Sequence, residues 1–167
     1  MKNAFNASCR NFAALAIGGA VAVLLPTAAF AYDEASTSSI NLSQENVAIA
    51  GHDPVAYFVT NEATKGDKKF SVTHQGATYY FASAGNRDAF KANPAKYEPQ
   101  FGGFCALGVA LGKKLDVDPT VWKIVDGKLY FNVNRDVQTK WNEDIPGNLV
   151  KAQANWPVLK DKTPKSL

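Results

Sequence analysis

Two regions of the chain, one in each half, alternate aromatic or β-branched residues with polar ones, which is the pattern of half-buried β-strands. Residues 70–74 and 77–81 have this character and flank a Gln-Gly pair that favours a turn. In the second half, residues 121–125 and 128–131 flank Asp126-Gly127, a strong signal for a tight hairpin. The pattern predicts two antiparallel β-hairpins, one in each half of the chain.

Capping residues and prolines mark short helices around the first hairpin. Asp53 can cap a helix through residues 55–58, with Pro54 at the first helical position. Ser83 can cap a longer helix that ends at Asn93-Pro94, because a residue before proline avoids the helical conformation. We expect another short helical turn directly after that proline.

The second half also contains apolar segments with helical character. The run 104–111 follows two glycines and predicts a buried helix with Cys105 in its first turn. From Asn134 the apolar residues follow a helical period, which predicts a helix, an interruption at Pro146-Gly147 and a second helix that ends before Pro157. Helices are thus expected after both hairpins.

The two halves resemble each other in sequence. Tyr80-Phe81 matches Tyr130-Phe131, and Asn86-Arg87-Asp88 matches Asn134-Arg135-Asp136. Two units are too few for a solenoid of stacked repeats. We therefore predict an α+β fold, a single compact domain with two β-hairpin–helix (ββα) units and peripheral short helices.

The N-terminus has the layout of a secretory signal peptide. Two basic residues precede the apolar run 12–25, which is followed by Pro26 and the small-residue ending Ala29-Phe30-Ala31. A retained membrane anchor is the alternative, since the apolar segment is long enough to span a bilayer. The proline and the small-residue ending favour cleavage after Ala31. This predicts a periplasmic or secreted protein without a stable membrane anchor.

The signal peptide is thus assigned to residues 1–31. Residues 32–46 are Ser-rich, polar and without periodicity, which predicts a flexible leader. The globular domain is expected over residues 47–157, followed by a polar tail over residues 158–167.

Composition and charge narrow the classes of partner. The chain has 167 residues, 46% hydrophobic and 20% charged, as in an ordinary globular domain. Its formal net charge is +3, and loss of Lys2 and Arg10 with the signal peptide brings it closer to neutral. Because it has no basic stripe, the protein lacks the electrostatic character of a nucleic-acid-binding protein. Nucleic acid is therefore not expected as a partner.

No catalytic constellation is recognisable in the sequence. It lacks a Ser-His-Asp order, a Gly-rich phosphate loop, a zinc-hydrolase helix and a paired-carboxylate arrangement. We therefore expect a protein that is not an enzyme.

Cys105 is the single thiol left after the predicted cleavage, so no disulfide can form within the mature chain. At the start of a helix its pKa would fall, which would make a reactive thiolate. Its apolar neighbours instead favour a small, buried and inert core residue. We expect burial to dominate.

Four sequence stretches form a characteristic set. They are Asp53-Pro54-Val55, the hairpin ending Tyr79-Tyr80-Phe81-x-Ser83, the run Phe90-x-x-Asn93-Pro94-x-x-Tyr97, and Gly102-Gly103-Phe104-Cys105-Ala106. Together they resemble the YHS domain, a small module found in metal-transporting ATPases and in freestanding secreted proteins. The core of the resemblance covers roughly residues 51–100, and similarity to the secreted, periplasmic branch extends through Trp156-Pro157.

The resemblance implies a metal role that this chain does not carry over directly. Metal-handling members of the family place cysteines at three positions that are occupied here by Ala56, Ala82 and Asn86. A copper or zinc ion would have to use the remaining soft or borderline ligands of the mature chain, which are His52, His74 and Cys105. None of these is at ligand spacing to another, so a site would depend on tertiary approach.

A small-ligand pocket is the other candidate site, lined by Tyr57, Tyr79, Tyr97 and Asp53. The leading hypothesis is a monomeric secreted or periplasmic YHS-like binding module for a metal ion, most plausibly copper, or for a small ligand. Two alternatives stay open: a thiol-dependent redox or stress protein acting through Cys105, and a purely structural interaction domain.

Overall fold

The computed structural model describes residues 32–167. The predicted signal peptide, its cleavage site and the alternative anchor lie outside the described residues. Within the described part, no helix is both long and apolar enough to cross a membrane.

The first hairpin forms as predicted, from β1 (Asp67–His74) and β2 (Ala77–Phe81). Gln75 and Gly76 both have positive φ, of 49° and 79°, as a tight hairpin turn requires. In β2 the buried side chains alternate, with Ala77, Tyr79 and Phe81 on the inner face. β1 begins at Asp67, three residues before the predicted strand 70–74.

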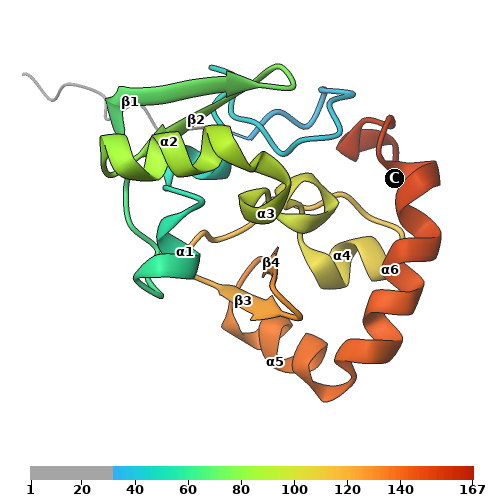
Figure 1. The fold of residues 1–167 in the computed structure, drawn as a ribbon. Coiled ribbons are helices and arrows are strands. Elements are labelled where there is room, and N and C mark those ends of the chain that lie inside the picture. Colours follow the sequence, from blue (N-terminus) through green and yellow to red (C-terminus); the bar gives the residue numbers. More distant parts are fainter. Residues whose placement is uncertain (1–31) are drawn as a thin grey trace, which may run out of the picture.

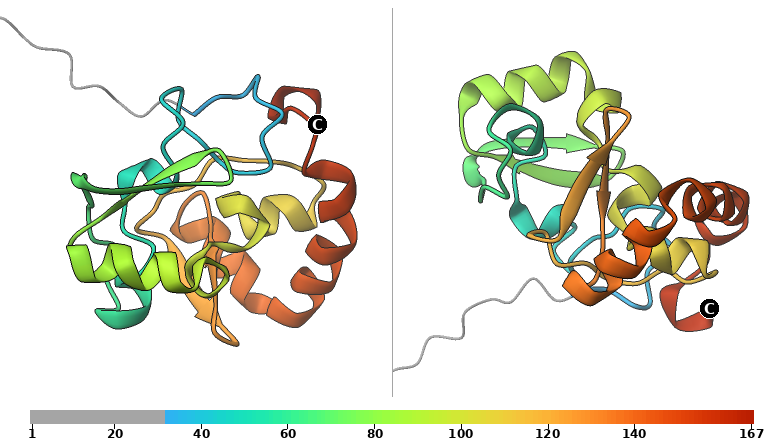
Figure 2. Two further views of the ribbon diagram at one scale, coloured as in Figure 1. Left: turned by 45° about the horizontal axis from the view of Figure 1, so that its top comes forward. Right: turned by 90° about the horizontal axis from the view of Figure 1, so that it is seen from below.

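The second hairpin also forms, from β3 (Trp122–Val125) and β4 (Lys128–Phe131), with positive φ at Asp126 and Gly127. The two hairpins make separate two-stranded sheets that run in different directions (Figure 2). The α+β prediction with two hairpin–helix units is confirmed.

A helix follows each hairpin and packs on it, α2 (Ala84–Ala92) on the first and α5 (Arg135–Glu143) on the second (Figure 1). Ser83 caps α2 by accepting the backbone N–H of Asn86, and Asn134 caps α5 by accepting that of Val137. The repeat is therefore aligned on Ser83 and Asn134. The predicted match of Asn86-Arg87-Asp88 with Asn134-Arg135-Asp136 is wrong in register, because Asn86 lies inside its helix.

The remaining helices are short, apart from the last. They are α1 (Ala56–Val59), α3 (Pro94–Tyr97), α4 (Ala106–Ala110) and α6 (Ile145–Leu159), with 3-10 turns at Ile49–Gly51, Gln100–Gly103 and Pro164–Ser166. α6 passes through Pro157, so the predicted end before that proline is wrong. Pro157 has no N–H to donate to the carbonyl of Gln153, but Gln153 is exposed, so water can take the place of that donor. Burial of Leu159 holds the final turn of the helix in place.

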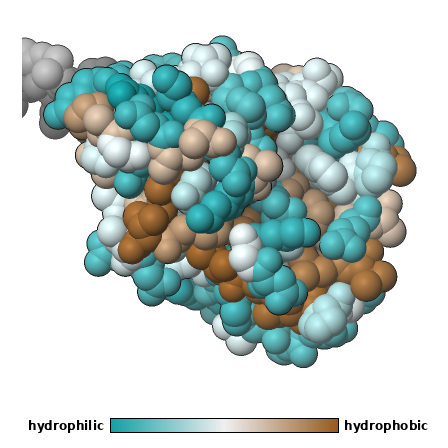
Figure 3. All heavy atoms as spheres, viewed as in Figure 1, coloured by the Kyte–Doolittle hydropathy of each residue, from teal (hydrophilic) through white to brown (hydrophobic). Residues whose placement is uncertain are grey.

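Strand β4 lies between two hydrophobic cores. Leu129 and Phe131 point into a first core with Tyr79, Phe81 and Phe90, whereas Tyr130 points into a second core with Phe104, Trp141 and Ala152. Because successive side chains of a strand face opposite sides, one short strand joins the cores. Apolar surface gathers near α1 and around α4 and α6 on the face in Figure 3. The exposed large hydrophobic residues in or beside these helices include Val59, Leu111, Val150 and Val158.

The first and last segments of the described residues, 32–46 and 158–167, both pack on this body and are hereafter called the two chain ends. In the segment 32–46, predicted to be a flexible leader, Ile40 and Leu42 belong to the first core, and Asn41 donates its backbone N–H to Gly102 O at 2.8 Å. Gly102 is required there, because a Cβ would lie 1.8 Å from Ser39 O and its φ is +60°. The structure places this segment in the fold and not in free solvent.

The tail is packed as well. Leu159 is buried, Leu167 packs against the second core, and the backbone N–H of Lys165 bonds Glu34 O at 3.2 Å. The domain boundary expected at 157 therefore has no counterpart in the packing, since the tail contacts the N-terminal segment.

Replacement of either Phe81 or Phe131 by alanine should lower the free energy of unfolding by roughly 3–5 kcal/mol, because both are fully buried strand-end residues. Denaturant titration of the two variants measures this. Val150→Ala is the control, since its side chain is exposed and should cost under about 0.5 kcal/mol. A loss below about 1 kcal/mol in either phenylalanine variant would contradict the two-core packing.

Candidate functional site

The carboxylate of Asp53 is fully buried and accepts four hydrogen bonds. Its Oδ1 accepts the backbone N–H groups of Val55, at 2.8 Å, and Ala56, at 3.3 Å. Its Oδ2 accepts the backbone N–H of Ala82, at 2.8 Å, and the side-chain amide of Asn86, at 2.6 Å. Asp53 therefore ties α1 to the end of β2 and the start of α2.

These contacts bring together the three positions at which metal-handling members of the resembled family place cysteine. Residues 56, 82 and 86 all surround the Asp53 carboxylate. Here they supply two backbone N–H donors and an amide, none of which is a soft metal ligand. The residues present do not fit a copper or zinc ion at this point, because the carboxylate oxygens are already taken by donors.

His52 is buried, and its Nδ1 lies 3.0 Å from Ile49 O. The carbonyl can only accept, so Nδ1 carries the proton in the folded protein. Burial lowers the pKa of His52 below its usual value, and the nearby charge of Lys65 adds to this effect. The neutral imidazole is thus a structural donor.

We expect His52 to make stability depend on pH. Its folded pKa is lowered from 6.5, so the unfolded chain binds the proton more readily. The free energy of unfolding should therefore fall as pH drops below about 6.5, by at most about 1.4 kcal/mol per pH unit for this one proton. Urea titrations at several pH values measure the slope.

The variant His52→Asn keeps a donor for Ile49 O but does not titrate, so the slope should flatten. His74→Asn serves as the control for the other histidine of the described chain. An unchanged slope in His52→Asn would show that another group causes the dependence.

His74 lies elsewhere, at the turn end of β1. Its Nε2 is 2.7 Å from Glu98 Oε1, and its ring meets Phe90 edge-on at 5.8 Å between centroids. Both members of this pair are half-buried. His74 thus ties the first hairpin to the segment after α3.

Cys105 is fully buried and caps α4. Its Sγ accepts the backbone N–H of Gly108 at 3.4 Å and donates to Asn132 Oδ1 at 3.5 Å. Burial raises the pKa of this thiol, outweighing the hydrogen bonds that would lower it. The predicted metal residues His52, His74 and Cys105 have separate sets of partners, and no group of three His, Cys, Asp or Glu side chains that could hold a metal occurs in residues 32–167.

We expect slow alkylation of native Cys105 by iodoacetamide at neutral pH, because the sulfur is covered and protonated. Mass spectrometry of the labelled protein measures the rate, with the same protein in denaturant as the fast-reacting control. Equal rates in the two states would show that the thiol is accessible.

The predicted ligand pocket does not form as one site. The Tyr57 hydroxyl donates to Pro119 O at 3.0 Å, and its ring packs edge-on against Trp122 and Phe131. Tyr97 packs against Phe58. Tyr79 lines a cavity of about 180 Å³ that also contains Glu98 and Trp156 in its wall, whereas Tyr57, Tyr97 and Asp53 do not line it.

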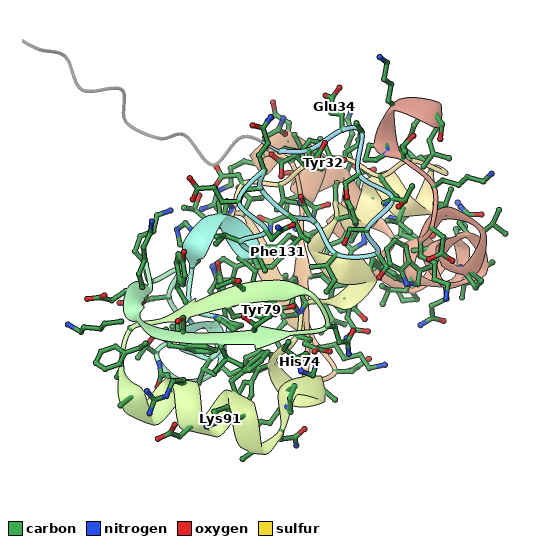
Figure 4. All side chains as sticks on the ribbon, turned by 90° about the horizontal axis from the view of Figure 1, so that it is seen from above. Tyr32, Glu34, His74, Tyr79, Lys91 and Phe131 are labelled. Atoms are coloured by element: carbon green, nitrogen blue, oxygen red, sulfur yellow. The ribbon has the colours of Figure 1, made fainter. Side chains whose placement is uncertain are left out.

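A larger cavity of about 690 Å³ lies where the two chain ends meet the body. It is lined from three parts of the chain, the N-terminal segment, the stretch after α4 together with Val133, and the C-terminal tail. Figure 4 shows Tyr32 and Glu34 close together, well away from His74 and Lys91. The lining residues are Tyr32, Glu34, Lys114, Leu115, Asp116, Val117, Asp118, Val133, Pro164, Lys165 and Leu167.

Lys114 holds the walls of this cavity together. Its side chain is 1% exposed, and its Nζ donates to Ser38 O at 2.8 Å, Lys160 O at 3.0 Å and Lys162 O at 2.7 Å. The ammonium group also lies 4.7 Å from the centre of the Phe104 ring. The backbone carbonyl of Lys114 accepts the Tyr32 hydroxyl at 3.1 Å. One buried cation thus joins both chain ends to the body.

The cavity carries a negative electrostatic environment near Tyr32. Burial raises the pKa of the Tyr32 hydroxyl, and the neighbouring carboxylates of Asp116 and Glu34 raise it further. Sequence reasoning missed this site because its walls come from segments predicted to be a leader and a tail. The sequence shows two acidic residues at positions 116 and 118, but the neighbouring residues do not indicate that these side chains line a cavity.

Comparison with family models matches residues 55–100 to the YHS domain. Comparisons with curated proteins and with solved structures gave no match. The matched segment begins beside Asp53 and contains α1, the first hairpin, α2 and α3. The match covers residues 55–100 and supports a relation of this segment to the YHS domain family.

Proposed function

We propose that the protein is an exported binding module in which a YHS domain supports a site for a small organic ligand. The observation that carries this proposal is the cavity of about 690 Å³ between the chain ends and the segment 114–118. Its size falls within the range of roughly 300–1,000 Å³ that is typical of small-molecule sites. The signal-peptide pattern of residues 1–31 supports export to the periplasm or the exterior.

The lining of the cavity is suited to binding. Leu115, Val117 and Val133 supply aliphatic surface, while Tyr32 and the carboxylates supply a few polar groups. Such a mixture gives affinity through apolar burial and orientation through polar contacts. The proposed activity is binding and transport or storage of the ligand, without a chemical step.

The other hypotheses have weaker support. A metal-handling role is disfavoured because residues 56, 82 and 86 provide no soft ligand for a metal. Their N–H groups instead donate hydrogen bonds to the Asp53 carboxylate. A redox role through Cys105 is disfavoured because its thiol is buried and its pKa is raised. The cavity therefore gives the better account of a function.

Native mass spectrometry of protein purified without denaturation tests the proposal. We expect a small organic adduct on the wild type, and its loss in Val133→Phe, whose larger side chain fills part of the cavity. Val150→Phe is the matched control, because Val150 is exposed on α6 and does not line the cavity. Absence of an adduct on the wild type, or equal retention in Val133→Phe, would contradict the proposal.

A further inference from the structure

We infer, on the basis of the proposed function, that the ligand of the large cavity is an organic cation with an apolar body, such as a small aromatic or aliphatic ammonium ion. The cavity juxtaposes three carboxylates, those of Glu34, Asp116 and Asp118, with the aliphatic side chains of Val117 and Val133. This combination is specific to a ligand that carries positive charge and hydrophobic surface together.

The carboxylates have acceptor capacity left for a ligand. Asp116 Oδ1 accepts from Asn41 Nδ2 at 2.9 Å and from the Val117 N–H at 2.8 Å, which fixes the orientation of the group. Asp118 Oδ1 is fixed in the same way by the backbone and the hydroxyl of Thr120. Their Oδ2 atoms and the Glu34 carboxylate accept no hydrogen bond from residues 32–167.

The cations in the wall do not offer a comparable site for an anion. All three N–H donors of Lys114 are used by the carbonyls of Ser38, Lys160 and Lys162. Lys165 is exposed on the tail and is the remaining lysine of the lining. An anionic ligand would therefore depend on one flexible surface side chain, whereas a cation can meet oriented carboxylates.

A metal ion does not fit the same carboxylates. Within residues 32–167, Glu34, Asp116 and Asp118 are not close enough to form a group that could hold a metal. An organic cation is larger, and it can contact separated carboxylates through several N–H or C–H groups while its body covers the aliphatic wall. The cavity lining therefore suits an organic cation better than a bare metal ion.

Calorimetric titration with three probes of similar shape tests the inference: phenethylammonium, phenylpropanoate and phenylpropanamide. We expect the cation to bind at least about tenfold more tightly than the amide, since hydrogen bonds to charged groups are stronger than neutral ones. The anion should bind most weakly. Binding of the cation should weaken as salt is added, because the carboxylates are partly exposed.

The variants Asp116→Asn and Asp118→Asn keep the oxygen that orients each side chain but remove its charge. Each should reduce binding of phenethylammonium by roughly tenfold, and the preference over phenylpropanamide should shrink. Asp136→Asn is the matched control, because it is an exposed aspartate on α5 outside the cavity. Normal thermal unfolding of the variants would separate lost charge from lost folding.

Equal or tighter binding of phenylpropanoate, unchanged affinity in both cavity variants, or binding of none of the probes would overturn the inference. If native mass spectrometry still showed an organic adduct that Val133→Phe loses, the proposed function would stand and only the ligand class would be wrong. Loss of the adduct as well would contradict the proposed function itself.

Discussion

Replacement of Asp53 by alanine should lower the free energy of unfolding by roughly 3–5 kcal/mol. The reason is that four N–H donors, including the Asn86 amide, would lose their acceptor in the interior. Unpaired buried donors cost far more than a hydrogen bond contributes net. Denaturant titration, with circular dichroism as the signal, measures the change.

Asp88→Ala is the matched control, since its carboxylate is largely exposed and pairs with Arg87. Such surface pairs contribute little to the free energy of unfolding, because solvent screens them. Asn86→Ala should fall between the two, because it removes a single donor from Asp53. A loss below about 1 kcal/mol in Asp53→Ala would contradict the role of this carboxylate as the centre of the domain.

Substitution of Lys114 by methionine should cost roughly 2–4 kcal/mol and release both chain ends. Methionine keeps apolar contact with the Phe104 ring but provides no donor for Ser38 O, Lys160 O and Lys162 O. The ends can then separate from the body so that water bonds these carbonyls. Hydrogen exchange should accelerate at residues 38–41 and 160–162, and binding in the cavity should weaken.

Lys113→Met is the control for the loss of a positive charge, because the side chain of Lys113 is exposed. We expect that variant to change stability by less than about 0.5 kcal/mol. Unaltered hydrogen exchange at both ends of Lys114→Met would show that other contacts hold them. The cavity would then not depend on this buried lysine.

Local signals predicted most of the secondary structure. The turn pairs Gln75-Gly76 and Asp126-Gly127 adopt the positive φ that a tight hairpin needs, and Ser83 caps its helix as expected. Such features are decided by neighbours in the chain and can therefore be read from it. The register of the repeat could not be predicted from the sequence. The Asn86 side chain donates a hydrogen bond to Asp53, whereas the Asn134 side chain caps α5.

Long-range contacts account for the errors at the chain ends. Residues 32–46 were predicted to be a leader because they are Ser-rich and polar, but Lys114 and Gly102 supply partners for Ser38 and Asn41 from the other half of the chain. Neither partner can be inferred from the local pattern. The candidate cavity shares this origin, since its walls meet only after both ends have docked.

The three predicted metal-binding residues show that residue type alone does not identify a metal site. His52, His74 and Cys105 were selected as the remaining metal-binding chemistries, but each satisfies a different structural contact: Ile49 O, Glu98 and Asn132. Asp53 was predicted to cap a helix and to line a ligand pocket with Tyr57, Tyr79 and Tyr97. Its four donors instead come from three segments that only the fold brings together.

A crystal structure of the protein purified without denaturation, with anomalous data collected at the copper and zinc edges, tests the central claim most directly. We predict density for a small organic molecule bounded by Tyr32, Val117 and Val133, next to the carboxylates of Asp116 and Asp118. An empty cavity together with an anomalous peak beside His52, His74 or Cys105 would contradict it.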